Sequence, residues 1–190
     1  MKIIGFNASP RNNGNTAWTI NKILEGANAH GAKTSLFNTS ELVIKPCRGC
    51  LGCHSDKNAH GCVINDDMQK LYAALEESAA MVLGSPIYMG QMSGQTKVFI
   101  DRLFAQISPR FSPHYKEKNA GKKLILVFTQ GNPKLDMFQT YYDYTKRMFE
   151  ILEFDVKEVL VVGGTRVEQA RDKAELPPLL KKIGASLVLD

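Results

Sequence analysis

Five short apolar segments alternate with amphipathic segments along this 190-residue chain and constrain its fold more than any other feature. Two of them, 79–84 and 124–128, are apolar almost throughout, which is typical of strands covered on both faces. Strands that alternate with helices form a parallel sheet between two helical layers. The sequence therefore predicts an α/β three-layer sandwich with a five-stranded parallel sheet in the order 2-1-3-4-5. The predicted strands are the apolar run from Lys2 and residues 33–38, 79–84, 124–128 and 156–162.

The intervening segments carry apolar residues at helical spacing. In residues 16–30, for example, Ala17, Ile20 and Leu24 fall on one face. This length suits one domain, and we expect residues 1–190 to form it, with a cysteine-containing insertion at 41–64. The other predicted helices follow residues 65–67 and cover about 94–106, 138–152 and 177–187.

A polar loop, residues 9–16, joins the first predicted strand to the first predicted helix. The first N–H groups of a helix lack internal partners, and its dipole favours an anion. In a triphosphate loop a lysine would stand at Asn15, so this loop suits a single terminal monophosphate. An ordinary turn before a helix would use similar residues. The candidate phosphate ligands are Ser9, Arg11, Asn13, Gly14, Asn15 and Thr16.

Two further loops follow the third and fourth predicted strands and should meet the first loop at the carboxyl edge of the sheet. Residues 86–93 offer apolar groups able to lie along a flat ring, and residues 129–133 offer amides for a heteroaromatic edge. A flat ring joined by a polar chain to one phosphate describes FMN. The candidate ring contacts are Pro86, Ile87, Tyr88, Met89, Thr129, Gln130 and Gly131.

All four cysteines lie in the 41–64 insertion, which shows little periodicity. The C-x2-C-x2-C spacing of Cys47, Cys50 and Cys53 is typical of a ferredoxin-type cluster, and Cys62 is the candidate fourth ligand. A [4Fe–4S] cluster, a zinc site in which His54 or His60 substitutes as a ligand, and unligated thiols all remain open. The candidate metal ligands are therefore Cys47, Cys50, Cys53 and Cys62.

Several motifs together resemble the NAD(P)H-dependent FMN reductase family of flavodoxin-like proteins. They are the S-P-R and G-N-T groups of residues 9–16, the G-S-P-I-Y of residues 84–88, and K-x3-D-R at 97–102. The cysteine spacing looks more narrowly like the iron–sulfur flavoprotein branch, although eight residues separate Cys53 from Cys62, a longer gap than usual there. The resemblance covers roughly residues 1–164.

This resemblance implies a flavodoxin-like domain that binds FMN, takes hydride from NAD(P)H, and forms homodimers or homotetramers. It implies a structural or subunit-contact role for Asp101 and Arg102. Electrons would pass to an unknown acceptor, through a cluster or directly. No catalytic side chain is predicted beyond the flavin site. A carrier reduced by a protein partner is the alternative, and residues 107–121 are a candidate nicotinamide pocket.

Charge and hydropathy narrow the classes of partner. The net charge is +5, but lysine and arginine are scattered, so no nucleic acid is expected. No window of membrane-spanning length is apolar, and no signal peptide is apparent at the start of the sequence. We therefore expect a cytoplasmic protein that needs no membrane.

Overall fold

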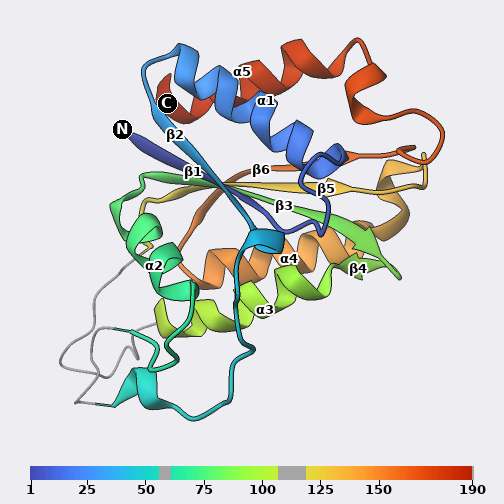
Figure 1. The fold of residues 1–190 in the computed structure, drawn as a ribbon. Coiled ribbons are helices and arrows are strands. Elements are labelled where there is room, and N and C mark those ends of the chain that lie inside the picture. The colour runs from blue at the N-terminus through green and yellow to red at the C-terminus, as the bar shows by residue number, and fades with distance from the viewer. Residues whose placement is uncertain (56–60, 107–118, 190) are drawn as a thin grey trace.

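The computed structural model describes residues 1–55, 61–106 and 119–189. A parallel sheet lies between two layers of helices, with α1 and α5 on one face and α2, α3 and α4 on the other (Figure 1). Each face of the sheet has its own apolar core. The predicted three-layer α/β sandwich is confirmed.

The five parallel strands lie in the order β2-β1-β3-β5-β6, which is the predicted order 2-1-3-4-5. The prediction of five strands was incomplete, because a two-residue strand, β4, pairs antiparallel with the end of β3. The strands are β1 (Lys2–Asn7), β2 (Lys33–Asn38), β3 (Ala80–Tyr88), β4 (Gln91–Met92), β5 (Lys123–Thr129) and β6 (Asp155–Val162).

The helices begin and end close to their predicted limits. They are α1 (Asn15–Ala29), α2 (Met68–Glu77), α3 (Gly94–Arg102), α4 (Gln139–Ile151) and α5 (Leu176–Leu189). Short 3-10 turns lie at Thr39–Glu41, Gly52–His54, Leu103–Gln106, Leu135–Phe138 and Ala170–Asp172. The helix predicted at 94–106 is thus an α-helix that ends in a 3-10 turn. None of the helices in the described ranges has the length and apolar content that a membrane crossing requires.

The third strand is longer than predicted. It continues past Gly84 to Tyr88, through a Ser-Pro pair that reads as a turn. Pairing with β1 ends at Gly84, whereas pairing with β5 continues to Pro86. Proline lacks an N–H donor and fits a strand only where one is not needed. Pro86 is therefore tolerated here because it lies beyond the part of β3 that has neighbours on both sides.

Close packing around α1 fixes the position of its N-terminus. A Cβ atom on Gly84 would lie 2.6 Å from a side-chain carbon of Ile20, so α1 rests directly on β3. On its other side, a Cβ on Gly184 of α5 would lie 1.9 Å from the carbonyl oxygen of Ile23. Because α1 packs closely against both the sheet and the backbone of α5, the loop before α1 is presented at a fixed place on the sheet edge.

Candidate functional site

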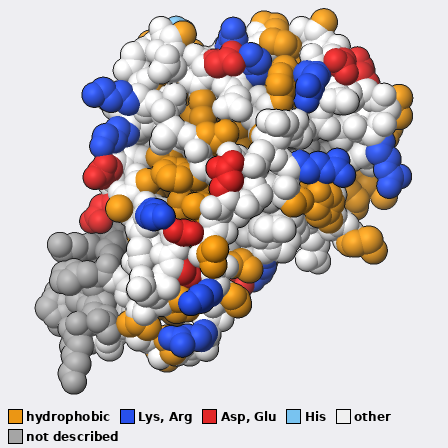
Figure 2. Space-filling model, viewed as in Figure 1, with side chains coloured by type: hydrophobic (Ala, Val, Ile, Leu, Met, Phe, Trp, Pro, Cys, Tyr) orange, Lys and Arg blue, Asp and Glu red, His pale blue; other side chains and the backbone are white. Residues whose placement is uncertain are grey.

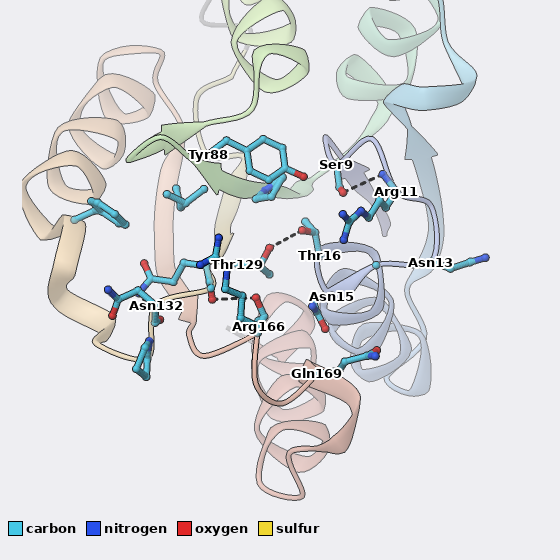
Figure 3. A pocket seen from close by; sticks show the side chains of 18 residues that line it. Ser9, Arg11, Asn13, Asn15, Thr16, Tyr88, Thr129, Asn132, Arg166 and Gln169 are labelled. Carbon is cyan, nitrogen blue, oxygen red and sulfur yellow. Dashed lines mark hydrogen bonds between the residues drawn. The ribbon is translucent and has the colours of Figure 1, made fainter.

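A pocket of about 990 Å³ opens at the carboxyl ends of β1, β3, β5 and β6 (Figure 3). It gathers twelve of the thirteen cofactor residues predicted from the sequence. Met89 lies outside the lining, at a positive φ of 50° in the turn between β3 and β4, with a fully exposed side chain. The twelve are Ser9, Arg11, Asn13, Gly14, Asn15, Thr16, Pro86, Ile87, Tyr88, Thr129, Gln130 and Gly131.

Asn7, the last residue of β1, shapes the loop that follows. It is fully buried, and its Oδ1 accepts a hydrogen bond from the Ser9 N–H at 3.2 Å. Its Nδ2 donates to Asn38 Oδ1 at 3.1 Å and to the Arg11 carbonyl at 3.4 Å. The buried Ser9 hydroxyl in turn accepts from the Arg11 N–H at 3.1 Å. These bonds hold the loop open around the pocket, and the Arg11 side chain remains exposed.

The N-terminus of α1 faces this loop without a side-chain cap. Gly14 occupies the cap position, and the first intrahelical bond runs from Trp18 N–H to its carbonyl at 3.0 Å. The N–H groups of the first turn therefore have no acceptor within the helix, which is the condition for anion binding. Thr16 Oγ1 lies 2.7 Å from Thr129 Oγ1 and joins this site to the loop after β5 (Figure 3).

Two predicted ligand side chains are already occupied by the protein. Asn15 Oδ1 accepts from the Ala170 N–H at 2.8 Å. Gln130 Nε2 donates to the carbonyls of Asn132 and Lys134, at 3.0 and 2.7 Å. Gln130 Oε1 accepts from the Tyr142 hydroxyl, and burial raises the pKa of that tyrosine to about 12, with a smaller contribution from Tyr141. The Gln130 side chain therefore shapes its own loop and is not free to bind a ligand.

The remaining wall of the pocket comes from the end of β3. Pro86 is buried, Ile87 is half-buried, and Tyr88 is 46% exposed. Beneath them the Ser85 hydroxyl accepts hydrogen bonds from Ser93 N–H at 3.0 Å and from Thr96 Oγ1 at 2.8 Å. These buried bonds hold the apolar wall at the pocket.

A fourth contribution to the pocket comes from the segment after β6 and was not predicted from the sequence. The missed residues were detectable, because the pair Gly163-Gly164 ends the fifth parallel strand at the same sheet edge. Applying the switch-point argument to every parallel strand would have included them. From this segment, Thr165, Arg166 and Gln169 line the pocket. The lining is completed by Asn132 and Pro133, which belong to the predicted loop 129–133, and by Phe138.

Comparison with known proteins identifies the family. The family model described as NADPH-dependent FMN reductase matches residues 1–137. The chain belongs to the NADPH-dependent FMN reductase family. The fold is flavodoxin-like: NAD(P)H:quinone oxidoreductase from Methanothermobacter marburgensis superposes with a TM-score of 0.74 at 12% identity, covering 98% of this chain and 96% of that one.

Curated relatives carry two kinds of name. An iron-sulfur flavoprotein of Methanocaldococcus jannaschii is 34% identical over 54% of this chain, and the match spans 51% of the relative, about half its length. A putative NAD(P)H-dependent FMN-containing oxidoreductase of Bacillus subtilis is 27% identical and covers 87% of each chain. This chain is thus similar both to proteins named iron-sulfur flavoproteins and to a protein named as an FMN-containing oxidoreductase.

Two of the four cysteines pack against the core on the face of the sheet that α2 and α3 cover. Cys47 and Cys50 are exposed, and Cys53 and Cys62 are half-buried against that core. Burial raises the pKa of the Cys53 thiol, and the neighbouring thiols, Cys62 first, raise it further. Within the described ranges, no three His, Cys, Asp or Glu side chains are arranged to hold a metal ion. His60, a candidate zinc ligand, lies outside the described residues.

A buried ion pair closes both ends of the cysteine segment. Arg102 of α3 binds Asp66 through two contacts of 2.6 and 3.2 Å, and both side chains are at most 1% exposed. The same guanidinium donates to the Lys45 carbonyl at 2.8 Å, and Asp66 accepts from Lys45 N–H at 2.9 Å. Arg102 therefore joins the chain before the first cysteine to the chain after the last. This geometry gives Arg102 a structural role, as expected from the sequence.

Proposed function

We propose that this chain is an FMN-dependent oxidoreductase that takes hydride from NAD(P)H and passes electrons to an acceptor. The observation that carries the proposal is the uncapped N-terminus of α1 beside Arg11, at one end of a pocket of about 990 Å³. A pocket of this size suits a cofactor. In this proposal residues 1–190 form a single FMN-binding domain.

The FMN phosphate would bind the first-turn N–H groups of α1, with hydrogen bonds from Ser9 and Thr16 and a charge-assisted bond from Arg11. Asn13 and Gly14 supply the backbone that bends around it. Asn15 contributes its backbone N–H, because its side-chain oxygen is held by Ala170. One arginine and no lysine in this loop favour a single phosphate over a triphosphate.

The isoalloxazine ring would lie against the apolar wall formed by Pro86, Ile87 and Tyr88. Its polar edge would meet Thr129 and the backbone of Gly131, which has no side chain to block a close approach. Bound FMN supplies the redox chemistry, so the protein's part is to bind the ring, orient it and limit access to it. We assign no acid, base or nucleophile to any residue.

We further propose that Cys47, Cys50, Cys53 and Cys62 hold a [4Fe–4S] cluster that connects the flavin to the acceptor. Support comes from their spacing, from the packing of Cys53 and Cys62 against the same core, and from the names of several relatives. Zinc and unligated thiols are the competing states, and analysis of metal and sulfide distinguishes all three.

Self-association is also part of the proposal. The turn between β3 and β4 lies beside the 3-10 turn Leu135–Phe138, since a Cβ on Gly90 would be 3.4 Å from the Phe138 ring. Met89 there is fully exposed and Met137 is 51% exposed. Adjacent exposed apolar groups at a pocket mouth suit a contact between copies of the chain.

On the face viewed in Figure 2, basic and acidic side chains are interspersed, which does not favour a nucleic-acid surface.

Rapid mixing tests the activity. FMN-loaded protein is mixed without oxygen with NADH or NADPH, and free FMN at the same concentration is the control. Loss of the oxidised flavin absorbance, much faster than in the control, supports the reductase. If neither nicotinamide reduces the flavin but a reduced iron–sulfur protein does, the chain is an electron carrier. The candidate nicotinamide segment, 107–121, lies largely outside the described residues.

A further inference from the structure

We propose that Arg166 faces the pyrimidine edge of the bound flavin ring and stabilises the negative charge that the ring gains on two-electron reduction. This inference rests on the proposed FMN site. It assigns to one residue, missed in the sequence, the electrostatic control of the cofactor's reduction potential.

Arg166 stands on a loop that is bonded to the loop after β5. Gln130 N–H donates to the Val162 carbonyl at 2.9 Å, and the Gln130 carbonyl accepts from Thr165 N–H at 3.1 Å and Thr165 Oγ1 at 3.0 Å. Gly164 N–H donates to the Asn132 carbonyl at 2.9 Å. The two loops thus form one hydrogen-bonded unit, which fixes the backbone position of Arg166.

The stem of Arg166 runs across Gly131. A Cβ atom on Gly131 would lie 3.0 Å from Arg166 Cγ, 3.2 Å from Cδ and 3.4 Å from Nε. A side chain at position 131 would press on the arginine stem, whereas glycine leaves room for it. Because the backbone of Gly131 is the proposed partner of the ring's polar edge, the guanidinium is placed at the same edge.

The charge of Arg166 is not neutralised by the rest of the described chain. Arg166 makes no ion pair or side-chain hydrogen bond within the described ranges, although it lines the pocket. Its neighbour Glu168 pairs with Lys173 at 3.2 Å. By contrast, the guanidinium of Arg171 on the same segment donates to the Asn13 carbonyl at 3.0 Å. Arg166 is therefore available to an anion in the pocket.

The position of Arg166 favours the ring over the phosphate. Arg11 and Arg166 come from different walls of the pocket, and Arg11 belongs to the loop before α1 (Figure 3). FMN has one phosphate, which the helix N-terminus and Arg11 already satisfy. Hydride from NAD(P)H brings two electrons and one proton to N5, releases NAD(P)⁺, and leaves one negative charge over N1 and the C2 carbonyl oxygen. A guanidinium at that edge binds the reduced ring better than the oxidised ring.

The test is the two-electron midpoint potential of bound FMN in Arg166→Gln, Arg166→Lys and the wild-type protein. Arg147→Gln on the exposed side of α4 is the matched control for loss of one positive charge. We expect Arg166→Gln to weaken the binding of reduced FMN about tenfold relative to oxidised FMN, a fall in potential of about 30 mV. Arg166→Lys should recover most of this loss, and Arg147→Gln should leave the potential unchanged.

Three results would overturn the assignment. The first is an Arg166→Gln protein that binds FMN with the wild-type potential. The second is a variant that binds FMN less tightly but riboflavin as before, since Arg166 would then serve the phosphate. The third is an effect on NADPH affinity alone. If the wild-type protein binds no FMN, the proposed function fails first, and that result is distinguishable from these three.

Discussion

The charge on Asp66 anchors the cysteine segment to the rest of the protein through Arg102. Replacing Asp66 by asparagine should show how much this anchor contributes to the free energy of unfolding. Asp66 lies in the turn before α2 and accepts hydrogen bonds from Arg102, Lys45 N–H and Met68 N–H, the last at 3.0 Å. Burial tends to raise the pKa of this carboxyl, but these hydrogen bonds outweigh burial and lower its pKa. In Asp66→Asn the guanidinium of Arg102 stays buried without its counter-charge.

The expected cost follows from that burial. Removing one partner of a buried ion pair costs about 3–5 kcal/mol, because the remaining charge is left uncompensated. Asparagine keeps the shape and one acceptor, so we expect a loss near the lower figure, about 3 kcal/mol. In a chain of this size each kcal/mol lowers Tm by about 2–4 °C, so Tm should fall by at least about 6 °C.

Urea denaturation and thermal unfolding measure the loss, and Asp67→Asn is the matched control. Asp67 is the next residue and pairs with Lys70, whose side chain is 72% exposed. Asparagine at position 67 can still accept the Val43 N–H that Asp67 Oδ2 accepts at 2.8 Å, so its substitution should have a much smaller effect. We also expect Cys53 and Cys62 to react faster with a thiol reagent in Asp66→Asn, because their segment loses its attachment to α3. Equal stability of the two variants would refute the reasoning.

Three shorter predictions follow from other parts of the molecule. Gly184→Ala should destabilise the fold by at least about 1–3 kcal/mol, since its Cβ would meet the backbone of α1, whereas Gly94→Ala, where nothing lies within 4 Å, should be tolerated in the same urea titration. Wild-type protein should lose stability as the pH falls from about 4 through the lowered pKa of Asp66, because the unfolded chain binds a proton at this carboxyl at a higher pH than the folded chain does. Asp66→Asn has no carboxyl at this position and should lose less stability over that range. Anaerobic wild-type protein should contain about four iron and four sulfide per chain, reduced sharply in Cys50→Ser; zinc, or four titratable thiols without metal, would rule out the cluster.

The sheet order and the helix limits were predictable from the sequence, because they depend on local patterns. Residues 33–38 form a strand with the predicted bounds, and α1 begins one residue before the predicted start. Apolar periodicity and switch-point geometry also predicted that the first loop and the loop after β5 line the same pocket. These features require only the spacing of residue types along the chain and general rules of α/β topology.

Features that depend on contacts across the fold were not predictable. The continuation of β3 through Pro86 depends on pairing with β5, and the occupied side chain of Gln130 depends on Tyr142, which lies on α4. The end of the fifth parallel strand indicates where Arg166 lies, but nothing in the sequence distinguishes Arg166 from the other residues of that segment. Its importance becomes visible only where its stem crosses Gly131.

The most direct measurement of the central claim is a titration of the flavin-free protein with FMN and with riboflavin, followed by flavin fluorescence. The account predicts that wild type binds FMN more tightly than riboflavin, and that Arg11→Ala weakens FMN binding by about 1.5–3 kcal/mol, roughly ten- to hundredfold. Riboflavin, which has no phosphate, should bind both proteins equally, and Arg147→Ala should match wild type. Equal weakening of FMN and riboflavin by Arg11→Ala, or equal affinity of wild type for the two flavins, would contradict a phosphate site at the N-terminus of α1.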